Sequence, residues 1–179
     1  MGDESVNDVT AYLGLGTNLS DRWANLREAL RLLTSEPGLR LTRCSQVYET
    51  EPWGVTEQPR FLNCVVEVAS TLAPEPLLAQ CKEVEERLGR VPGPRWGPRL
   101  IDVDILLYGT QVVELPDLEI PHPQLHLRAF ALIPLAELAP SAVHPVLGRK
   151  ISELAQAAEG HDGVTPAGGI QLPPEDSEC

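Results

Sequence analysis

The chain has 179 residues, of which 42% are hydrophobic, and a formal net charge of −12 at pH 7. A domain of this size buries enough apolar surface to fold without disulfides, and no stretch approaches the roughly 20 apolar residues that span a bilayer. Nine acids and no Lys or Arg lie in residues 1–10 and 151–179, so residues 11–150 hold 17 acids and 14 bases. The acidity belongs to the chain ends, and nothing indicates the basic face that nucleic-acid binding requires.

The four cysteines are widely separated and form no CxxC motif. Cys44, Cys64 and Cys81 lie among apolar residues, which is typical of buried thiols in a reducing compartment. The first residues lack the basic and apolar regions of a secretory signal. We therefore expect a cytoplasmic monomer that binds neither membrane nor nucleic acid.

Strand and helix patterns alternate along the chain. In order, they predict a strand over 9–15, a helix capped by Ser20 and stopped by Pro37-Gly38, strands over 39–50 and 61–70, a helix from Pro74 to a C-terminal cap at Gly89, and a strand over 100–108. This β-α-β-β-α-β order predicts an α/β fold, an α+β sandwich of the ferredoxin-like kind, with a mainly antiparallel sheet and flanking helices.

The C-terminal part predicts a further helix over 126–138 and then little regular structure. Residues 161–179 are rich in Gly, Pro and acids, which favours a disordered tail. We therefore expect one domain over residues 1–160.

The strand over 100–108 carries two aspartates among apolar residues. Alternation places Asp102 and Asp104 on one face and Leu107, with the other odd-numbered apolar residues, on the opposite face. The aspartate β-carbons would then lie about 6–7 Å apart. Carboxylates at this spacing suit a pair of magnesium ions. The alternative is structural pairing with Arg95 or Arg99.

The segment before this strand, residues 90–99, contains three arginines, three prolines and two glycines. Guanidinium groups bind phosphate oxygens in pairs, so arginines beside a metal-binding pair favour polyphosphate chemistry. The alternative is that they neutralise Glu83, Glu85 and Glu86. The chain contains no GxxxxGK[ST] motif, which excludes a P-loop enzyme.

Several motifs, in order from about residue 9 to about residue 155, resemble the 6-hydroxymethyl-7,8-dihydropterin pyrophosphokinases of the folate pathway. They are AYLGLGTNL (11–19), YETEPWG (48–54), QPRFLN (58–63), RWGPRLIDVDIL (95–106), PH (121–122) and RAF (128–130). Glu51, Trp53, Phe61 and Asp117 depart from the family pattern, where proline, leucine, tyrosine and arginine, respectively, are familiar.

The resemblance implies transfer of the terminal pyrophosphate of ATP to the pterin hydroxymethyl group, with release of AMP. It implies two Mg²⁺ ions on Asp102 and Asp104, and stabilisation of phosphate charge by Arg90 and Arg99. The implied ATP contacts are Glu85, Arg90, Trp96, Arg99, Ile105, His122 and Arg128. The implied pterin contacts are Thr50, Pro52, Trp53, Phe61, Asn63, Trp96 and Phe130.

The residue chemistry agrees with the pterin assignment. Asn63 offers both a donor and an acceptor to the edge of a heterocycle, while Phe61 shares its face and Phe130 can stack from the other side. Ordinary core packing is the alternative for both phenylalanines. Two other functions stay open: a magnesium-dependent nucleotidyl or phosphoryl transferase with another acceptor, and a non-catalytic ferredoxin-like binding module.

Overall fold

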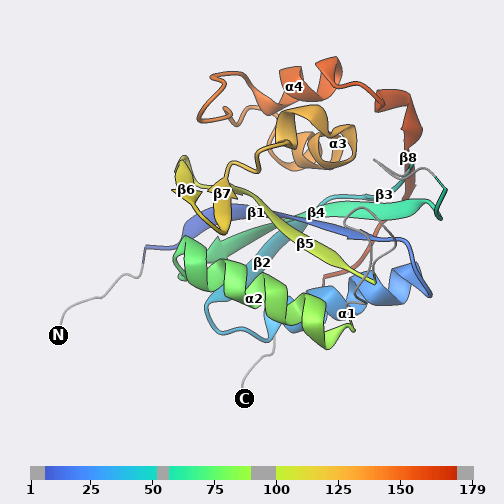
Figure 1. Ribbon diagram of the computed structural model, residues 1–179, viewed down its shortest axis with the longest axis horizontal. Coiled ribbons are helices and arrows are strands. Elements are labelled where there is room, and N and C mark those ends of the chain that lie inside the picture. The colour runs from blue at the N-terminus through green and yellow to red at the C-terminus, as the bar shows by residue number, and fades with distance from the viewer. Residues whose placement is uncertain (1–6, 52–56, 90–99, 173–179) are drawn as a thin grey trace.

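The computed structural model describes residues 7–51, 57–89 and 100–172. Within these ranges six strands form one antiparallel sheet in the order β5-β1-β4-β3-β8, with β2 also paired to β4. Helices α1 and α2 cover one face of the sheet, and α3 and α4 cover the other (Figure 1). No helix in the described ranges is long and apolar enough to cross a bilayer.

The main-sheet strands are β1 (Val9–Thr17), β2 (Leu39–Cys44), β3 (Val47–Thr50), β4 (Phe61–Ser70), β5 (Asp102–Tyr108) and β8 (Val164–Gly168). The helices are α1 (Arg22–Thr34), α2 (Pro74–Arg87), α3 (Ala129–Leu138) and α4 (Ile151–Ala157), with short 3-10 turns η1 (Leu125–Leu127) and η2 (His161–Gly163). A separate hairpin contains β6 (Val113–Leu115) and β7 (Leu118–Ile120).

The expected ferredoxin-like fold is confirmed, with one strand divided. The predicted strand over 39–50 is β2 followed by β3, and both pair with β4. At the break, the Ser45 N–H donates to the Val65 carbonyl, and the Ser45 hydroxyl accepts from the Val65 N–H, both at 2.9 Å. The serine side chain thus takes a place in the ladder that a backbone carbonyl would fill.

The helix ends follow their capping residues. The prediction that Ser20 caps α1 is wrong by one residue, because the Asp21 side chain accepts from the Ala24 N–H at 3.0 Å. Ser20 instead has a positive φ of 56° in the preceding turn. Helix α2 begins at Pro74 as expected, and Gly89, with a φ of +74°, follows its last turn.

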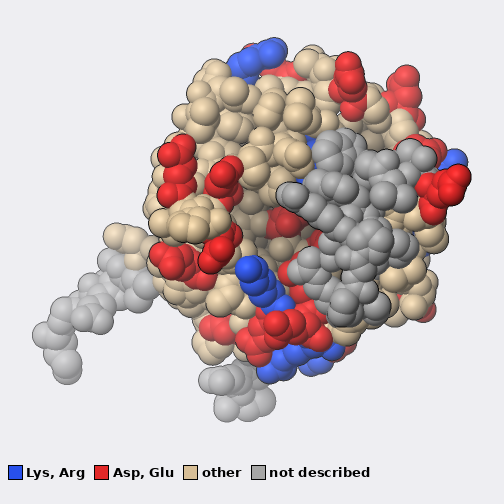
Figure 2. Space-filling model, in the orientation of Figure 1, with Lys and Arg blue, Asp and Glu red and all other residues tan. Residues whose placement is uncertain are grey.

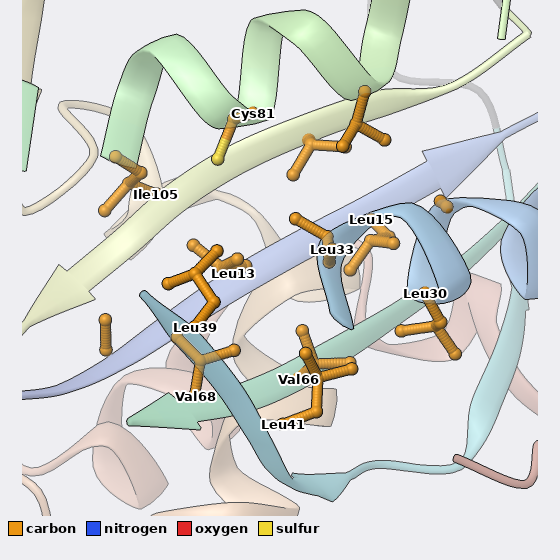
Figure 3. Packing of buried hydrophobic residues seen from close by; sticks show 14 of the residues in the cluster. Leu13, Leu15, Leu30, Leu33, Leu39, Leu41, Val66, Val68, Cys81 and Ile105 are labelled. Atoms are coloured by element: carbon orange, nitrogen blue, oxygen red, sulfur yellow. The ribbon is translucent and has the colours of Figure 1, made fainter. Parts of the chain in front are cut away.

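Two hydrophobic cores hold the layers together. One lies between the sheet and α1 and α2, where Leu13, Leu33, Cys81 and Ile105 meet (Figure 3). The other lies under α3 and α4 and includes Leu107. The two cores sit on opposite faces, so the aspartates of β5 are positioned by a strand anchored from both sides.

The predicted face of Leu107 is wrong because β5 contains an irregularity. Tyr12 pairs with Leu107 but Leu13 pairs with Ile105, which leaves Leu106 as an extra residue on β5. A bulge of this kind reverses the alternation beyond it. Leu107 therefore packs in the core under α3, while Ile105 stays in the core under α2.

The expected disordered tail over 161–179 is wrong for the residues that form β8. This strand extends the sheet by pairing with β3, with Thr50 opposite Val164 and Tyr48 opposite Pro166. A strand that contains proline is tolerated here because β8 lies at the edge of the sheet. Residues 173–179 lie outside the described ranges.

Candidate active site

A row of paired residues crosses the sheet. Asp102 on β5 pairs with Gly16 on β1, Gly16 pairs with Asn63 on β4, and Asn63 pairs with Tyr48 on β3. Residues directly opposite each other in an antiparallel sheet point to the same face. Asp102 and Asn63 therefore share a face, and only a glycine separates them.

This face is the one covered by α3. Asp104 is two residues from Asp102 and pairs with Gly14, which in turn pairs with Val65, a member of the core under α3. The predicted common face of the two aspartates is thus confirmed. The same face carries the predicted pterin contacts on β4.

Gly16 leaves the space that Asn63 occupies. A β-carbon at position 16 would lie 2.5 Å from Asn63 Oδ1 and 3.7 Å from Phe61 Cδ1. A β-carbon at Gly14 would have Leu106 side-chain atoms as its nearest neighbours, at 3.4 Å and beyond. The two glycines therefore differ: Gly16 is needed to leave the Asn63 amide in place, and Gly14 is not.

Three predicted pterin contacts lie together at the ends of β3 and β4. Thr50 pairs with Phe61, and Asn63 Nδ2 donates to Thr50 Oγ1 at 2.6 Å. Asn63 is 7% exposed, and Phe61 is half-buried beside it. Phe130, in the first turn of α3, packs against the core on this same face.

Arg128 lies beside the carboxylate strand. Its Nη1 is 4.0 Å from Asp104 Oδ2, and its side chain is 9% exposed while that of Asp104 is 45% exposed. Burial lowers the pKa of Arg128 and the charges of Asp104 and Asp102 oppose this shift, but a guanidinium stays protonated in proteins. The Phe130 ring centroid lies 5.5 Å from Arg128 Cζ, which adds a cation–π contact.

His122 is oriented by the backbone around it. Its N–H donates to the Leu106 carbonyl at 3.1 Å, and its Nδ1 accepts from the Gln124 N–H at 3.1 Å. Burial lowers the pKa of His122, the charge of Asp104 opposes this, and Arg128 adds to it. The imidazole is therefore neutral at pH 7, with its proton on Nε2 because Nδ1 acts as the acceptor.

The Gln124 side chain joins the same group, and sequence reasoning missed it. Its Oε1 accepts from Arg128 Nη2 at 2.7 Å. The helix predicted over 126–138 begins as η1 and continues as α3 only after Arg128. The four-residue spacing between Gln124 and Arg128 was the signal available, but residue 124 lay outside the predicted helix.

Glu85 and Ile105, both predicted ATP contacts, hold β5 from the α2 side. Glu85 is 6% exposed, and its Oε2 accepts from the Val103 N–H at 3.2 Å. The Ile105 side chain is buried in the core near Cys81 (Figure 3). Only backbone atoms of Ile105 are therefore placed to face a ligand at this edge.

The Gly-Thr-Asn segment, in which β1 ends at Thr17, ties together two stretches of the site. The Thr17 hydroxyl donates to the carbonyl of Leu100, two residues before Asp102. The Asn18 amide donates to Gln58 Oε1 at 2.8 Å and to the Pro59 carbonyl at 3.1 Å. The sequence indicated a turn here but not these contacts.

The remaining predicted contacts lie outside the described residues: Pro52, Trp53, Arg90, Trp96 and Arg99.

The donor set near β5 suits a hard cation. Within the described ranges no three His, Cys, Asp or Glu side chains gather as a metal site, so Asp102 and Asp104 provide two carboxylates and no closed cage. Magnesium characteristically takes one or two carboxylates and completes its coordination with water and phosphate oxygens. The exposure of Asp104 leaves access for such ligands. Figure 2 shows further acids spread around this view of the surface.

Comparison with known proteins shows which family the chain resembles. The family model for 7,8-dihydro-6-hydroxymethylpterin-pyrophosphokinase matches residues 12–140. A 2-amino-4-hydroxy-6-hydroxymethyldihydropteridine pyrophosphokinase of Aquifex aeolicus is 41% identical over 145 residues, which cover 81% of this chain and 89% of the relative. The enzyme of that name from Methylorubrum extorquens is 47% identical over 133 residues, or 74% and 84% of the two chains.

Solved structures show the same fold. The Plasmodium falciparum HPPK-DHPS A437G crystal structure superposes with a TM-score of 0.67 at 18% identity, over 86% of this chain and 46% of that one. The chain thus spans less than half of that longer protein. By the family match and the identity to these relatives, the chain belongs to the 7,8-dihydro-6-hydroxymethylpterin-pyrophosphokinase family.

Proposed function

We propose that the chain transfers the terminal pyrophosphate of ATP to the hydroxymethyl oxygen of 6-hydroxymethyl-7,8-dihydropterin and releases AMP. The names of its relatives support a pyrophosphokinase of this kind in folate synthesis. One observation carries the assignment to this chain: Asp102 and Asn63 lie on the same face of the sheet, with only Gly16 between them. Asp102, which is assigned to the phosphate side, and Asn63, which is assigned to the heterocycle, thus face the same space.

On the phosphate side, Asp102 and Asp104 are the residues that would hold magnesium, and two ions suit two adjacent carboxylates. When bound, magnesium neutralises phosphate charge and supports both the attacking and the leaving oxygen. Arg128 brings a positive charge to within 4.0 Å of Asp104. We assign it, with His122, to the ATP phosphates or ribose, since the neutral imidazole can donate from Nε2.

The other ATP assignments rest on the family resemblance. Glu85 and the backbone of Ile105 border the same edge of β5. Arg90, Trp96 and Arg99 are assigned by their motif, and the two arginines would stabilise phosphate charge during transfer.

On the pterin side, Asn63 is the residue that would form hydrogen bonds with the edge of the pterin ring. One Nδ2 hydrogen bond goes to Thr50, and the amide has a second N–H and a carbonyl oxygen for the edge of the ring. Phe61 lies beside Asn63 on the sheet, and Phe130 lies on α3 over the same face, so the two rings can flank a flat heterocycle. Pro52, Trp53 and Trp96 are assigned to the same site by the resemblance.

In the proposed reaction the pterin hydroxymethyl oxygen attacks the β-phosphorus of ATP. A bond forms between that oxygen and the β-phosphorus, the bond from the β-phosphorus to the bridging oxygen of AMP breaks, and the hydroxyl proton passes to solvent. The described residues offer no strong general base at this site, so positioning and electrostatics carry the rate.

The test is to incubate the purified chain with Mg²⁺, ATP and 6-hydroxymethyl-7,8-dihydropterin and to identify the nucleotide product. Pyrophosphate transfer yields AMP, and only when the pterin is present. A phosphoryl transferase would yield ADP, a nucleotidyl transferase would release pyrophosphate, and a binding module would leave ATP intact. Any of these three results would overturn the proposed function.

A further inference from the structure

Among the described residues, Gln124 and Asp104 approach the Arg128 guanidinium at unequal distances. Its Nη2 donates to Gln124 Oε1 at 2.7 Å, while its Nη1 stays 4.0 Å from Asp104 Oδ2, which is beyond hydrogen-bonding distance. The Phe130 ring lies against the guanidinium at 5.5 Å. The neutral amide of Gln124 therefore makes the short contact, and the carboxylate does not.

Because the Gln124 amide is neutral, it leaves the positive charge of Arg128 in place. An amide oxygen fixes the direction of a guanidinium but carries no charge to neutralise it. A carboxylate at position 124 would form a charge-assisted pair with Arg128 and reduce its attraction for another anion. A residue with no acceptor would remove this short bond and let the guanidinium move closer to Asp104, whose oxygens the proposed metal site uses.

We propose that Gln124 is a positioning residue, whose side-chain carbonyl holds Arg128 beside Asp104 while leaving the arginine charge available to a phosphate of ATP. This inference rests on the proposed function. The backbone of Gln124 also donates to His122 Nδ1, and this bond survives substitution of the side chain. Variants at position 124 therefore alter Arg128 and leave the orientation of His122 in place.

The experiment is a double-mutant cycle with Gln124→Ala, Gln124→Glu, Arg128→Met and the two double variants, in the full chain. ATP affinity is measured by calorimetry with Mg²⁺, and kcat and both KM values are measured alongside. We expect Gln124→Ala to weaken ATP binding about 3- to 10-fold, because it removes the charge-assisted hydrogen bond to Arg128. We expect Gln124→Glu to weaken ATP binding further, because the new carboxylate neutralises the charge of Arg128. The pterin KM stays within about twofold of wild type, because the Gln124 side chain bonds to Arg128 on the phosphate side of the site.

The cycle also separates positioning from folding. In the Arg128→Met background neither change at position 124 alters ATP affinity further, because the group it positions is gone. Gln156→Ala, on the exposed side of α4, is the matched control and leaves ATP affinity unchanged. Wild-type ATP affinity in Gln124→Ala, or a full effect of that change in the Arg128→Met background, would overturn the inference. A lower melting temperature in Gln124→Ala, with no change in ATP affinity, would also overturn the inference.

Failure of the proposed function gives a different result. If the wild type binds ATP but forms no AMP with the pterin, the reaction is wrong, and the calorimetric cycle still decides the role of Gln124. If the wild type does not bind ATP with Mg²⁺, the positioning role is overturned as well.

Discussion

Glu85 on α2 accepts a hydrogen bond at 3.2 Å from the backbone N–H of Val103 on β5. Val103 lies between Asp102 and Asp104, and β5 is an edge strand of the sheet formed by the described residues. An edge strand has backbone groups without a strand partner on its outer side. The buried carboxylate thus fixes the part of β5 that presents both aspartates.

Replacing Glu85 with alanine leaves the Val103 N–H buried without this acceptor, so we expect a loss of about 1–3 kcal/mol in the free energy of unfolding. Glu85→Gln keeps an acceptor oxygen and retains most of that stability. Urea unfolding of both variants measures the difference, with Glu86→Ala on the exposed side of α2 as the control. Equal losses in Glu85→Ala and Glu86→Ala would contradict this role.

Gly16→Ala tests the space beside Asn63. The new β-carbon would lie 2.5 Å from Asn63 Oδ1 and must displace the end of that flexible side chain. We therefore expect the pterin KM to rise about tenfold or more, the equivalent of one or two hydrogen bonds, with little loss of melting temperature. Gly14→Ala, whose β-carbon has Leu106 side-chain atoms nearest to it at 3.4 Å, keeps a pterin KM near that of wild type. Equal effects of the two substitutions would count against the assigned role of Asn63.

The regular parts of this fold could be predicted from the sequence. Strand β4 was predicted over 61–70, as observed, because a dense run of β-branched residues has no competing pattern. The start of α2 followed from Pro74. The common face of Asp102 and Asp104 followed from alternation alone, which the bulge at Leu106 leaves intact since it lies beyond them.

The remainder depends on contacts between distant segments. Strand β8 forms only because β3 offers an open edge, and its Gly-Pro-rich sequence carries no strand pattern. The break at Ser45 depends on a side-chain bond to Val65 across the sheet. Gln124 bonds to Arg128, and Thr17 bonds to the Leu100 carbonyl, through contacts that no local periodicity encodes.

A partly exposed network around Glu67 makes stability depend on pH. Glu67 on β4 accepts from Arg43 at 2.6 Å, Tyr12 at 2.9 Å and Thr42 at 2.8 Å. These bonds, that of Arg43 first, lower the pKa of Glu67 to about 2. Because the folded pKa lies below its ordinary value of 4.5, the carboxylate stabilises the fold above that pH. This contribution is lost as the pH falls from about 4.5 toward 2.

Glu67→Gln should therefore lower the free energy of unfolding by about 1–3 kcal/mol at pH 7, and the gap to wild type should narrow below pH 4. Urea titrations at pH 7 and pH 3 provide the comparison. Glu28→Gln, which removes an exposed pair with Arg31 on α1, costs less than about 1 kcal/mol at either pH. A gap for Glu67→Gln that is the same at both pH values would rule out the linkage.

The pairing of β8 with β3 predicts that a chain shortened at its C-terminal end is less stable. A chain that ends after residue 160 lacks β8, which pairs with Val47–Thr50 of β3. It also lacks the hydrogen bond from the Glu51 N–H to the Gly163 carbonyl. We expect the melting temperature to fall by on the order of 5 °C or more, since a loss of 1 kcal/mol shifts a domain of this size by about 2–4 °C. A chain ending after residue 172 keeps β8 and the wild-type value. Identical melting curves for the two chains would show that β8 contributes no stability.

The central claim is that Asp102 and Asp104 support the transfer of pyrophosphate rather than the fold. Its most direct measurement is magnesium-dependent AMP formation from ATP and 6-hydroxymethyl-7,8-dihydropterin by Asp102→Asn and Asp104→Asn, with melting curves and with Asp162→Asn as an exposed control. We predict that each site variant loses turnover by about 100-fold or more, while its melting temperature and the control stay near wild type. Turnover within a few fold of wild type in both site variants, or unfolding of both, would contradict the account.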